Sequence, residues 1–398
     1  MTYFDHNATA PLLRAAREAW LQASEEFVGN PSSPHRVGAR AEVALADARE
    51  RLANLLGCRA TELMWTSGAT EANNFVFHHF SGILPSDRVV WVSAIEHPCV
   101  IESAFHYFPG RVRTIPVKRH GLVDSAWLLE NLPNQKPGLV AMMAANNVTG
   151  VIQPWRQVAA ICRDHEVPFF CDAVQWVGKE PSGVLAECDF VSGCAHKVGG
   201  PRGIGFLKCP SHGRVRPLLL GGPQEDGRRA GTENVAGALA LVATLEARAE
   251  SFLRDDATLR RSWRDQFEQS LVEELPGTEI LGQNQPRLWN TVAALMPECD
   301  GPHRWLVKLD KHGFAASTGS ACSSGREAPS SVLLAMGYEP LEASRILRFS
   351  SGWETSLEDW MALLRALKRV HQELRDSEGA QNHGKPRRGR DFCRIESE

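Results

Sequence analysis

The chain has ten cysteines but no Cys-x-x-Cys pair among its 398 residues. A zinc site needs clustered ligands, and a disulfide scaffold is normally a much shorter secreted chain, so the sequence favours neither. We expect reduced thiols in a cytoplasmic protein without a bound metal. Cys162, Cys171 and Cys188 are expected in the core, because cysteine is among the most buried residue types.

The chain also lacks a strong charge imbalance and a long hydrophobic run. Its formal net charge of −3 gives no reason to expect nucleic acid or an anionic membrane as a partner. The longest weakly apolar stretch, residues 236–245, is too short to span a bilayer, and no signal peptide is expected at the start. With 43% hydrophobic and 23% charged residues, the composition is that of a soluble globular protein large enough for two domains.

One cysteine lies in unusual surroundings. Residues 317–325, which include Cys322, are all small and mostly polar, with Gly319 and Gly325 near the ends. Such a run has little apolar surface to bury, so it predicts an exposed, mobile loop. An exposed cysteine indicates a thiol kept for its reactivity.

Short apolar runs alternate with helical patterns from about residue 60 to 210, which is typical of a parallel sheet with crossover helices. Strands are expected at residues 63–66, 88–93, 139–144, 167–171 and 190–192. Pro154 is expected to open a helix that runs to about Asp164, and helical patterns resume over residues 234–275.

The same patterns predict two domains. A large domain is expected at residues 13–254, and a smaller α+β unit at residues 255–375, with residues 1–12 returning to pack on it. Residues 376–398 are polar and rich in glycine, and they are expected to form a disordered tail. Docking of a partner by this basic tail is the alternative.

Ligands bind beyond the carboxyl ends of strands in parallel α/β sheets. The turn at residues 67–70 opens a helix there, so its N–H groups and the Thr70 hydroxyl could hold a phosphate, although a plain helix cap has the same sequence. Lys197 also follows a strand and precedes a glycine-rich segment, residues 199–205. A lysine shielded from water becomes a Schiff-base nucleophile, whereas an isolated one is usually a surface residue.

Asp172 favours the interpretation of Lys197 as a Schiff-base lysine, because pyridoxal phosphate needs a carboxylate against its pyridinium nitrogen. Taken singly, Asp172 could cap a helix, His97 could be a turn histidine, and Asn147 could be a left-handed turn residue. All of these simple explanations together are improbable.

Ordered motifs then run along nearly the whole chain. They are Asp5-His6-Asn7-Ala8-Thr9, Gly29-Asn30-Pro31-Ser32-Ser33 with His35, Thr66-Ser67-Gly68-Ala69-Thr70-Glu71, Ala145-Asn146-Asn147 with Gly150, His196-Lys197, Arg229 with Gly231-Thr232-Glu233-Asn234, Gly319-Ser320-Ala321-Cys322, and Arg348-Phe349-Ser350. From Phe4 to about Arg375 the chain resembles the pyridoxal-phosphate-dependent cysteine desulfurases of the class V aminotransferase superfamily, the type that serves nitrogen fixation and iron–sulfur cluster assembly.

The resemblance implies an α/β protein of fold type I, with a mostly parallel seven-stranded sheet in the large domain and a smaller α+β C-terminal domain. It implies a homodimer that converts L-cysteine to L-alanine. The sulfur would pass through Cys322 to an acceptor, such as an iron–sulfur scaffold protein, a sulfurtransferase or a tRNA-thiolation enzyme.

The resemblance also assigns roles around the cofactor ring. Lys197 would hold pyridoxal phosphate as a Schiff base and then move protons at the substrate. Asp172 would pair with the ring nitrogen, Gln175 would reach the phenolic oxygen, and His97 would stack over the ring.

Further residues would hold the phosphate and the substrate. Those expected at the cofactor are Ala69, Thr70, Cys194, His196 and, from the other subunit, Thr232. Asn147 and Arg348 would bind the substrate carboxylate, since the arginine fork suits a planar carboxylate, and the Cys322 thiolate would attack the substrate sulfur.

Two positions depart from the family pattern. Cys194 stands where the family usually has serine before Gly-His-Lys, and a thiol is a poorer donor to phosphate. Asp226 stands where a basic residue is common, which affects a dimer or cofactor contact. A selenocysteine lyase, an aminotransferase of the same superfamily, and a non-catalytic paralogue acting as an assembly scaffold are the alternative functions.

Overall fold

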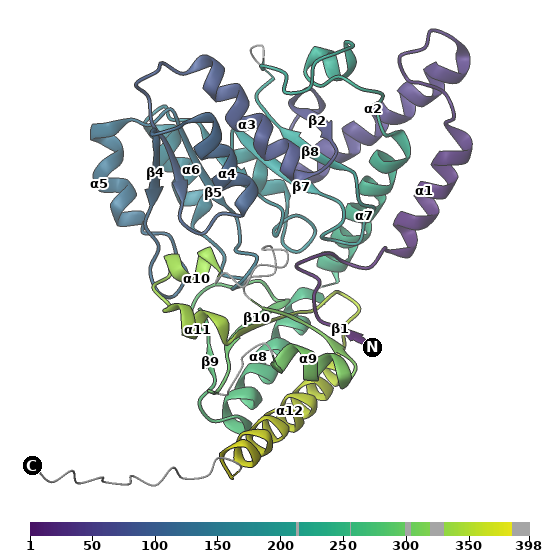
Figure 1. Ribbon diagram of the computed structural model, residues 1–398. Coiled ribbons are helices and arrows are strands. Elements are labelled where there is room, and N and C mark those ends of the chain that lie inside the picture. Colours follow the sequence, from purple (N-terminus) through teal and green to yellow (C-terminus); the bar gives the residue numbers. More distant parts are fainter. Residues whose placement is uncertain (212–214, 255, 299–303, 319–329, 384–398) are drawn as a thin grey trace, which may run out of the picture.

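The computed structural model describes residues 1–211, 215–254, 256–298, 304–318 and 330–383. The expected loop at residues 317–325 falls mostly outside these ranges, and Cys322 itself lies outside the described residues. Figure 1 shows an upper unit built on a large sheet and a lower unit built on a small one, with strand β1 in the lower unit.

A seven-stranded sheet forms the centre of the upper unit (Figure 1). Its strands are β2 (Leu63–Thr66), β3 (Val90–Ser93), β4 (Val112–Ile115), β5 (Leu139–Met143), β6 (Phe169–Asp172), β7 (Phe190–Cys194) and β8 (Gly205–Lys208). The spatial order is β2-β8-β7-β6-β5-β3-β4, and β8 alone runs opposite to the other six strands of this sheet. The predicted α/β fold with a mostly parallel seven-stranded sheet is therefore confirmed.

Helices cover both faces of this sheet, which is why its strands are apolar throughout instead of alternating with polar residues. In β5, Val140 and Met142 contribute to one core, whereas Leu139 and Ala141 contribute to the other. The first core includes residues of α2 (Arg36–Leu56), α5 (Ser125–Gln135), α6 (Trp155–Asp164) and α7 (Val235–Leu253), and the second includes residues of α3 (Ala69–Ile83) and α4 (Pro98–Tyr107).

Two helix boundaries differ from the expectation. Helix α6 begins at Trp155, and Pro154 is its N-cap with ψ of 42°, so the proline precedes the first helical residue. The helical stretch expected over residues 234–275 is divided into α7 and α8 (Asp256–Glu274). Outside the sheet, helix α1 (Arg14–Glu26) packs on α7, and short 3-10 helices lie at Ala60–Glu62, Gly183–Glu187 and Gln224–Gly227.

The lower unit contains a four-stranded antiparallel sheet. Its spatial order is β12 (Ser317–Thr318), β13 (Ile346–Ser350), β10 (Thr291–Leu295) and β9 (Glu279–Ile280). The helices of this part are α8, α9 (Arg304–Lys311), α10 (Ser331–Ala335), α11 (Pro340–Ser344) and α12 (Leu357–His383). Helix α12 extends into the segment that the sequence predicts as a tail, and residues 384–398 lie outside the description.

The N-terminal segment joins this lower unit. Strand β1 (Thr2–Tyr3) pairs in parallel with β11 (Phe314–Ala315), and Phe4 is fully buried in the same core as Trp305, Phe349 and Trp360. The division into domains at residues 12/13, 254/255 and 375/376 stays a prediction. The residues that follow Phe4 reach the loop after β7 of the large sheet, where the Ala10 N–H donates to the backbone oxygen of His196.

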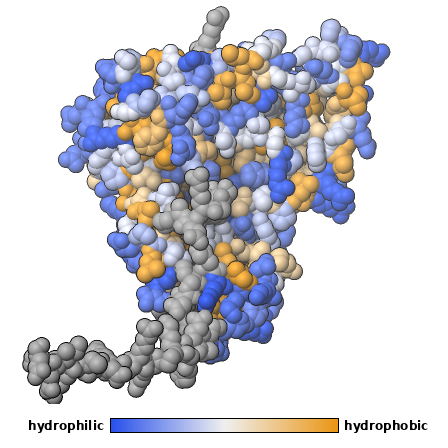
Figure 2. Space-filling view, viewed as in Figure 1, coloured by the Kyte–Doolittle hydropathy of each residue, from blue (hydrophilic) through white to orange (hydrophobic). Residues whose placement is uncertain are grey.

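The surface in Figure 2 is mostly hydrophilic, with hydrophobic groups that lie apart from one another, one of them along α1. The exposed apolar side chains of α1 and α2 include Trp20, Leu21 and Val43. No helix in the described ranges is both long and apolar enough to cross a membrane.

Candidate active site

A cavity of about 510 Å³ lies where the carboxyl ends of the large-sheet strands meet residues from the N-terminal segment. It is lined by Ala8, Thr9, Ser67, Gly68, Ala69, Thr70, Glu71, His97, Cys99, Met143, Ala145, Asn147, Asp172, Val174, Gln175, Cys194, His196, Lys197, Arg202 and Gly203. Its volume is in the range typical of small-molecule and cofactor sites.

The first turn of α3 forms one end of the cavity. An ideal Cβ added at Gly68 would meet no atom within 4 Å, so the turn opens toward free space, and the first N–H groups of the helix lie beside that space. Burial raises the pKa of Cys194, at the end of β7, to about 11, so this thiol stays protonated at neutral pH. It can therefore act as a neutral, weak donor beside the backbone of Ala69.

Glu71 also lines this end of the cavity, where a free carboxylate would repel an anion. Its Oε1 accepts a hydrogen bond from Arg229 Nε at 2.9 Å, and Oε2 accepts one from the backbone N–H of Ser67 at 2.8 Å. Burial by itself would raise the pKa of Glu71, but these hydrogen bonds and the Arg229 charge lower it. Arg229 thus offsets the negative charge of Glu71 at the start of the helix.

Asp172 is the last residue of β6 and is 95% shielded from solvent. Its Oδ2 accepts a hydrogen bond from Asn73 Nδ2 at 2.9 Å, and its Oδ1 accepts one from the backbone N–H of Val174 at 3.0 Å. Neither donor is a cation, so neither contact takes the place of a positively charged group from the cavity.

His97 follows β3 and is the N-cap of α4. Its Nδ1 accepts the backbone N–H of Cys99 at 3.2 Å, so the proton of the neutral ring lies on Nε2. The Cys99 Sγ lies 2.9 Å from the same Nδ1 and accepts a hydrogen bond from Asn73 Nδ2 at 3.1 Å. Asn73 therefore connects the Asp172 carboxylate to the Cys99–His97 pair.

Lys197 reaches the cavity from the loop after β7. Its Nζ donates hydrogen bonds to the backbone oxygens of Asn7 and Ala8, at 2.7 and 2.8 Å. The neighbouring His196 has its pKa lowered to about 4 by burial, then by the charges of Lys197 and Arg202, so it is neutral at pH 7. The N-terminal segment thus holds the lysine amine at the cavity.

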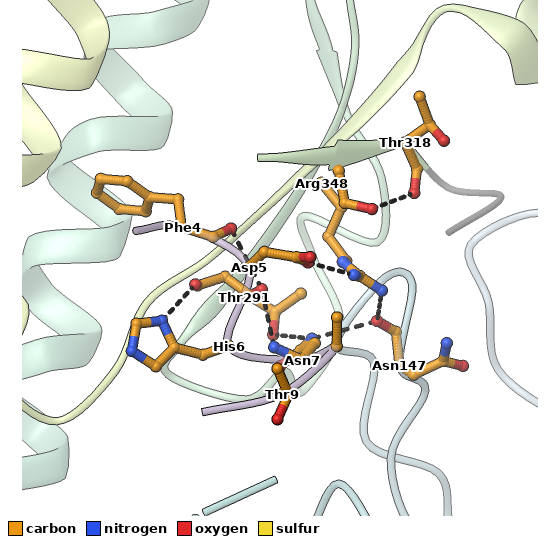
Figure 3. A network of polar contacts seen from close by, with 12 residues as sticks. Phe4, Asp5, His6, Asn7, Thr9, Asn147, Thr291, Thr318 and Arg348 are labelled. Atoms are coloured by element: carbon orange, nitrogen blue, oxygen red, sulfur yellow. Dashed lines mark hydrogen bonds and ion pairs between the residues drawn. The ribbon is translucent and has the colours of Figure 1, made fainter. Parts of the chain in front are cut away.

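Asn7 is the centre of the polar network drawn in Figure 3 and is 1% exposed. Its side-chain Nδ2 donates to Thr291 Oγ1 at 2.9 Å and to the backbone oxygen of Asn147 at 3.2 Å. Its backbone oxygen accepts Gln175 Nε2 at 3.0 Å in addition to Lys197 Nζ. One buried asparagine therefore connects Thr291 of the lower unit to three cavity residues, Asn147, Gln175 and Lys197.

Arg348 lies behind the cavity and is 1% exposed. Figure 3 shows its guanidinium directed at Asp5 and Asn147: one terminal nitrogen donates to Asp5 Oδ1 at 2.6 Å, the other to the backbone oxygen of Asn147 at 3.0 Å. Two buried side-chain atoms here, Arg348 Nε and Asn147 Oδ1, have no hydrogen-bond partner among the described residues. Asn147 lines the cavity, so its free amide oxygen marks a polar position for a ligand.

The structure brings together most of the predicted site residues. Those that line the cavity are Ala69, Thr70, His97, Asn147, Asp172, Gln175, Cys194, His196 and Lys197. Arg348 contacts Asn147 but does not itself line the cavity, and Cys322 lies outside the described residues. Thr232 lines a smaller neighbouring pocket of about 110 Å³, which shares Ser67 and Gly203 with the cavity.

Several residues of this site were not singled out by sequence reasoning. They are Asn7, Asn73, Cys99, Lys179 and Arg202. Asn7 belongs to a motif, and Lys179 follows Gln175 by one helical turn's spacing, but neither pattern reveals a role. In the described parts of the chain, no group of three His, Cys, Asp or Glu side chains could hold a metal ion.

Comparison with known proteins gives concordant matches. The family model described as aminotransferase class-V matches residues 2–363. A cysteine desulfurase of Enterobacter agglomerans is 38% identical over 352 residues, which cover 87% of each chain. A cysteine desulfurase IscS of Dictyoglomus turgidum is 34% identical over 381 residues, covering 94% of this chain and 95% of that one. The solved structure of a NifS-like protein superposes with a TM-score of 0.85 at 29% identity, covering 94% of this chain and 100% of its own.

Proposed function

The chain belongs to the class-V aminotransferase family, and from that premise we propose that it is a pyridoxal-phosphate-dependent cysteine desulfurase. It would convert L-cysteine to L-alanine and leave the sulfur as a persulfide on Cys322. The observation that carries the proposal is the convergence of Lys197, Asp172 and Gln175 on one cavity at the carboxyl end of the sheet.

The cavity residues fit the cofactor. The open turn at Gly68 and the first N–H groups of α3 suit its phosphate, with Ala69, Thr70, Cys194 and His196 around it. The buried carboxylate of Asp172 suits the ring nitrogen, and His97 and Gln175 would contact the ring and its phenolic oxygen. Bound there through Lys197, pyridoxal phosphate supplies an electron sink that acidifies the substrate Cα–H and makes the substrate sulfur open to attack.

The chain itself supplies proton transfer and orientation. Lys197, once released by the incoming substrate amine, would take the Cα proton as general base and return it as general acid. Its amine is kept at the cavity by the backbone oxygens of Asn7 and Ala8. Asn147 would donate a hydrogen bond from its side-chain NH₂ group to the substrate carboxylate, and Arg348 would hold the Asn147 backbone from behind.

Sulfur transfer requires a nucleophile, and this role is assigned to Cys322. Its thiolate would attack the substrate sulfur and form the S–S bond, while the electron pair of the broken C–S bond stays on carbon and is protonated. The products balance: L-cysteine and the Cys322 thiol give L-alanine and the Cys322 persulfide.

The test asks which thiol carries the sulfur, because Cys99 also lines the cavity. Cys322→Ser should abolish sulfide release from L-cysteine while the visible absorbance of the bound cofactor stays. Cys58→Ser, which changes a partly buried thiol away from the cavity, is the matched control and should keep full turnover. Persulfide mapping by mass spectrometry should find the extra sulfur on Cys322. Undiminished turnover of Cys322→Ser, or a persulfide on Cys99 instead, would overturn the assignment.

The partners remain proposals. The protein would act as a homodimer in which Thr232 reaches the cofactor phosphate of the other subunit, and it would pass sulfur to an iron–sulfur scaffold protein or a sulfurtransferase. Thr232 lines a pocket that adjoins Ser67 and does not line the cavity of its own subunit, which supports the proposal that it serves the other subunit. A cytoplasmic location stays a prediction.

A further inference from the structure

Lys179 is a buried lysine directly behind the cavity, and the proposed reaction assigns it no task. It lies in the turn after β6 and is 4% exposed. Its Nζ donates hydrogen bonds to Asn7 Oδ1 at 2.8 Å and to Gln175 Oε1. Among the described residues, Lys179 has no carboxylate within ion-pair distance, although a buried ammonium normally needs one.

The hydrogen bonds of Lys179 match those of a neutral amine. Burial, then the charges of Lys197 and Arg348, lower the pKa of Lys179 well below its ordinary value. A neutral amine has two N–H groups, and two acceptors face it, namely Asn7 Oδ1 and Gln175 Oε1. Lys179 is therefore placed to act as a hydrogen-bond donor instead of as a charge.

The hydrogen bond from Lys179 to Gln175 determines the orientation of the Gln175 side-chain amide. Gln175 Oε1 accepts from Lys179, and Gln175 Nε2 donates to the backbone oxygen of Asn7 at 3.0 Å. Rotating the amide by 180° would set its oxygen against the Asn7 carbonyl oxygen and would leave one N–H of Lys179 without its acceptor. Only the observed orientation therefore satisfies both the Lys179 donor and the Asn7 acceptor.

In that orientation Nε2 has a second N–H beyond the one given to Asn7. Because Gln175 lines the cavity, we propose that Lys179 is a positioning residue that fixes the Gln175 amide with an N–H, and not its oxygen, available to a bound anionic oxygen. Under the proposed function, that oxygen is the phenolic oxygen of the cofactor. The same Asn7 backbone oxygen also accepts a hydrogen bond from Lys197 Nζ, so the orientation of the Gln175 amide is coupled to the lysine that would carry the cofactor.

The competing explanation is that Lys179 only fills space and ties the N-terminal segment to the sheet. Lys208 provides a control for the loss of a buried lysine, because it is also 4% exposed and does not line the cavity. Its Nζ donates to the backbone oxygen of Cys188 and, unlike Lys179, also lies 3.9 Å from a carboxylate, that of Glu62. Removing either buried donor should lower the melting temperature. Only the removal of Lys179 should change the affinity and the absorbance of the cofactor.

The experiment titrates pyridoxal phosphate into the full-length protein freed of cofactor, for the wild type, Lys179→Met, Gln175→Met and the double variant. Each single variant should raise the cofactor Kd about tenfold and shift the absorbance maximum, since losing a hydrogen bond to a charged group costs about that factor. The double variant should be no worse than Gln175→Met, because Lys179 acts through that side chain. Lys208→Met should leave the Kd unchanged.

The proposal fails if Lys179→Met destabilises the protein but binds cofactor like the wild type, or if the two single effects add in the double variant. Lys179→Gln keeps an N–H donor and should recover most of the lost affinity, and a Kd as weak as that of Lys179→Met would also overturn the proposal. A wild type that binds no pyridoxal phosphate would refute the proposed function itself, which separates the two failures.

Discussion

The two walls of the cavity are held in place in different ways. The sheet wall consists of residues 67–70, 97, 172–175 and 194–197, all at or just after the carboxyl ends of strands. The N-terminal wall is formed at the cavity by Ala8 and Thr9 and is supported from behind by residues 5–7, Thr291 and Arg348. In the sheet wall, many hydrogen bonds join close neighbours in the sequence, such as Asp172 with Val174 and His97 with Cys99. In the N-terminal wall, the side-chain hydrogen bonds of Asp5, His6 and Asn7 join residues 140 to 344 positions apart.

This difference suggests a division of tasks. The ladder of a buried parallel sheet fixes the sheet wall through many backbone hydrogen bonds, which suits a cofactor that stays bound. The N-terminal wall depends on a few long-range side-chain contacts centred on Asn7, and Arg348 meets the cavity from behind through Asn147. We expect changes in the sheet wall to alter cofactor binding and kcat, and changes at Arg348 to alter KM.

The largest effect is expected in the sheet wall. Asp172→Asn keeps the side-chain shape and can still accept the Val174 N–H, but it removes the negative charge that would stabilise a protonated ring nitrogen. We expect kcat to fall by about 10²- to 10³-fold, the loss typical of removing one preorganised electrostatic contact.

Sulfide release at saturating L-cysteine and the absorbance of the bound cofactor measure this effect. Asp189→Asn is the matched control, because Asp189 Oδ2 accepts the backbone N–H of Phe169 at the opposite end of the same strand. Equal losses in both variants would mean that Asp172 only supports β6, and the division between the walls would lose its main support.

The next largest effect is expected at Arg348. Arg348→Lys keeps the charge, but a single ammonium cannot replace the fork that bonds Asp5 and Asn147 at once. If this fork helps to hold the substrate carboxylate, KM for L-cysteine should rise about 10- to 100-fold, as expected for weakened charged hydrogen bonds. The cofactor spectrum should not change.

Steady-state kinetics with L-cysteine separate KM from kcat in this variant. Arg345→Lys, which alters an ion pair with Glu298 before the same strand, serves as the control and should behave like the wild type. A fall in kcat with an unchanged KM would place Arg348 with the sheet wall and break the comparison.

The two walls also differ in how far the sequence predicts them. The strand-end rule locates Asp172, Lys197 and the turn at residues 67–70, because the position of a residue after a strand sets its place in space. Asn7 and Lys179 cannot be found in this way, since their roles depend on partners such as Gln175 Oε1 and Thr291, which meet only after both units have folded.

The same limit applies to Cys99. The sequence shows a cysteine two residues after His97, but only the folded chain shows that Asn73, on another helix, donates to both Cys99 and Asp172. The fold follows more directly from the sequence, because the apolar runs of the strands indicate burial, as in β5, where every residue is buried. Helix starts such as that of α6 depend on one residue's backbone angles and are off by one position.

Titrating groups near the two walls give the smallest expected effects, and of opposite sign. Burial, then the charge of Asp172, raises the pKa of Glu96, beside the sheet wall, to about 8, with His97 acting in the opposite direction. Burial lowers the pKa of His6, in the N-terminal wall, to about 4, with the charge of Arg248 adding to this and Ser350 and Glu354 opposing it. His6 Nδ1 lies 3.1 Å from the backbone oxygen of Ser350 and donates to it in the neutral ring.

Between pH 4.5, the ordinary pKa of Glu96, and about pH 8, the folded protein holds the Glu96 proton more tightly than the unfolded chain does. This group therefore makes the unfolding free energy fall as pH rises. Between about 4 and its ordinary 6.5, the unfolded chain holds more protons at His6, so the unfolding free energy rises with pH. Urea titrations from pH 4.5 to 8 should therefore show that Glu96→Gln removes a falling slope and His6→Asn, which keeps a donor toward Ser350, removes a rising one. Each slope should reach at most about 1.4 kcal/mol per pH unit. Slopes of the same sign would contradict the prediction that the fold raises the pKa of Glu96 and lowers the pKa of His6.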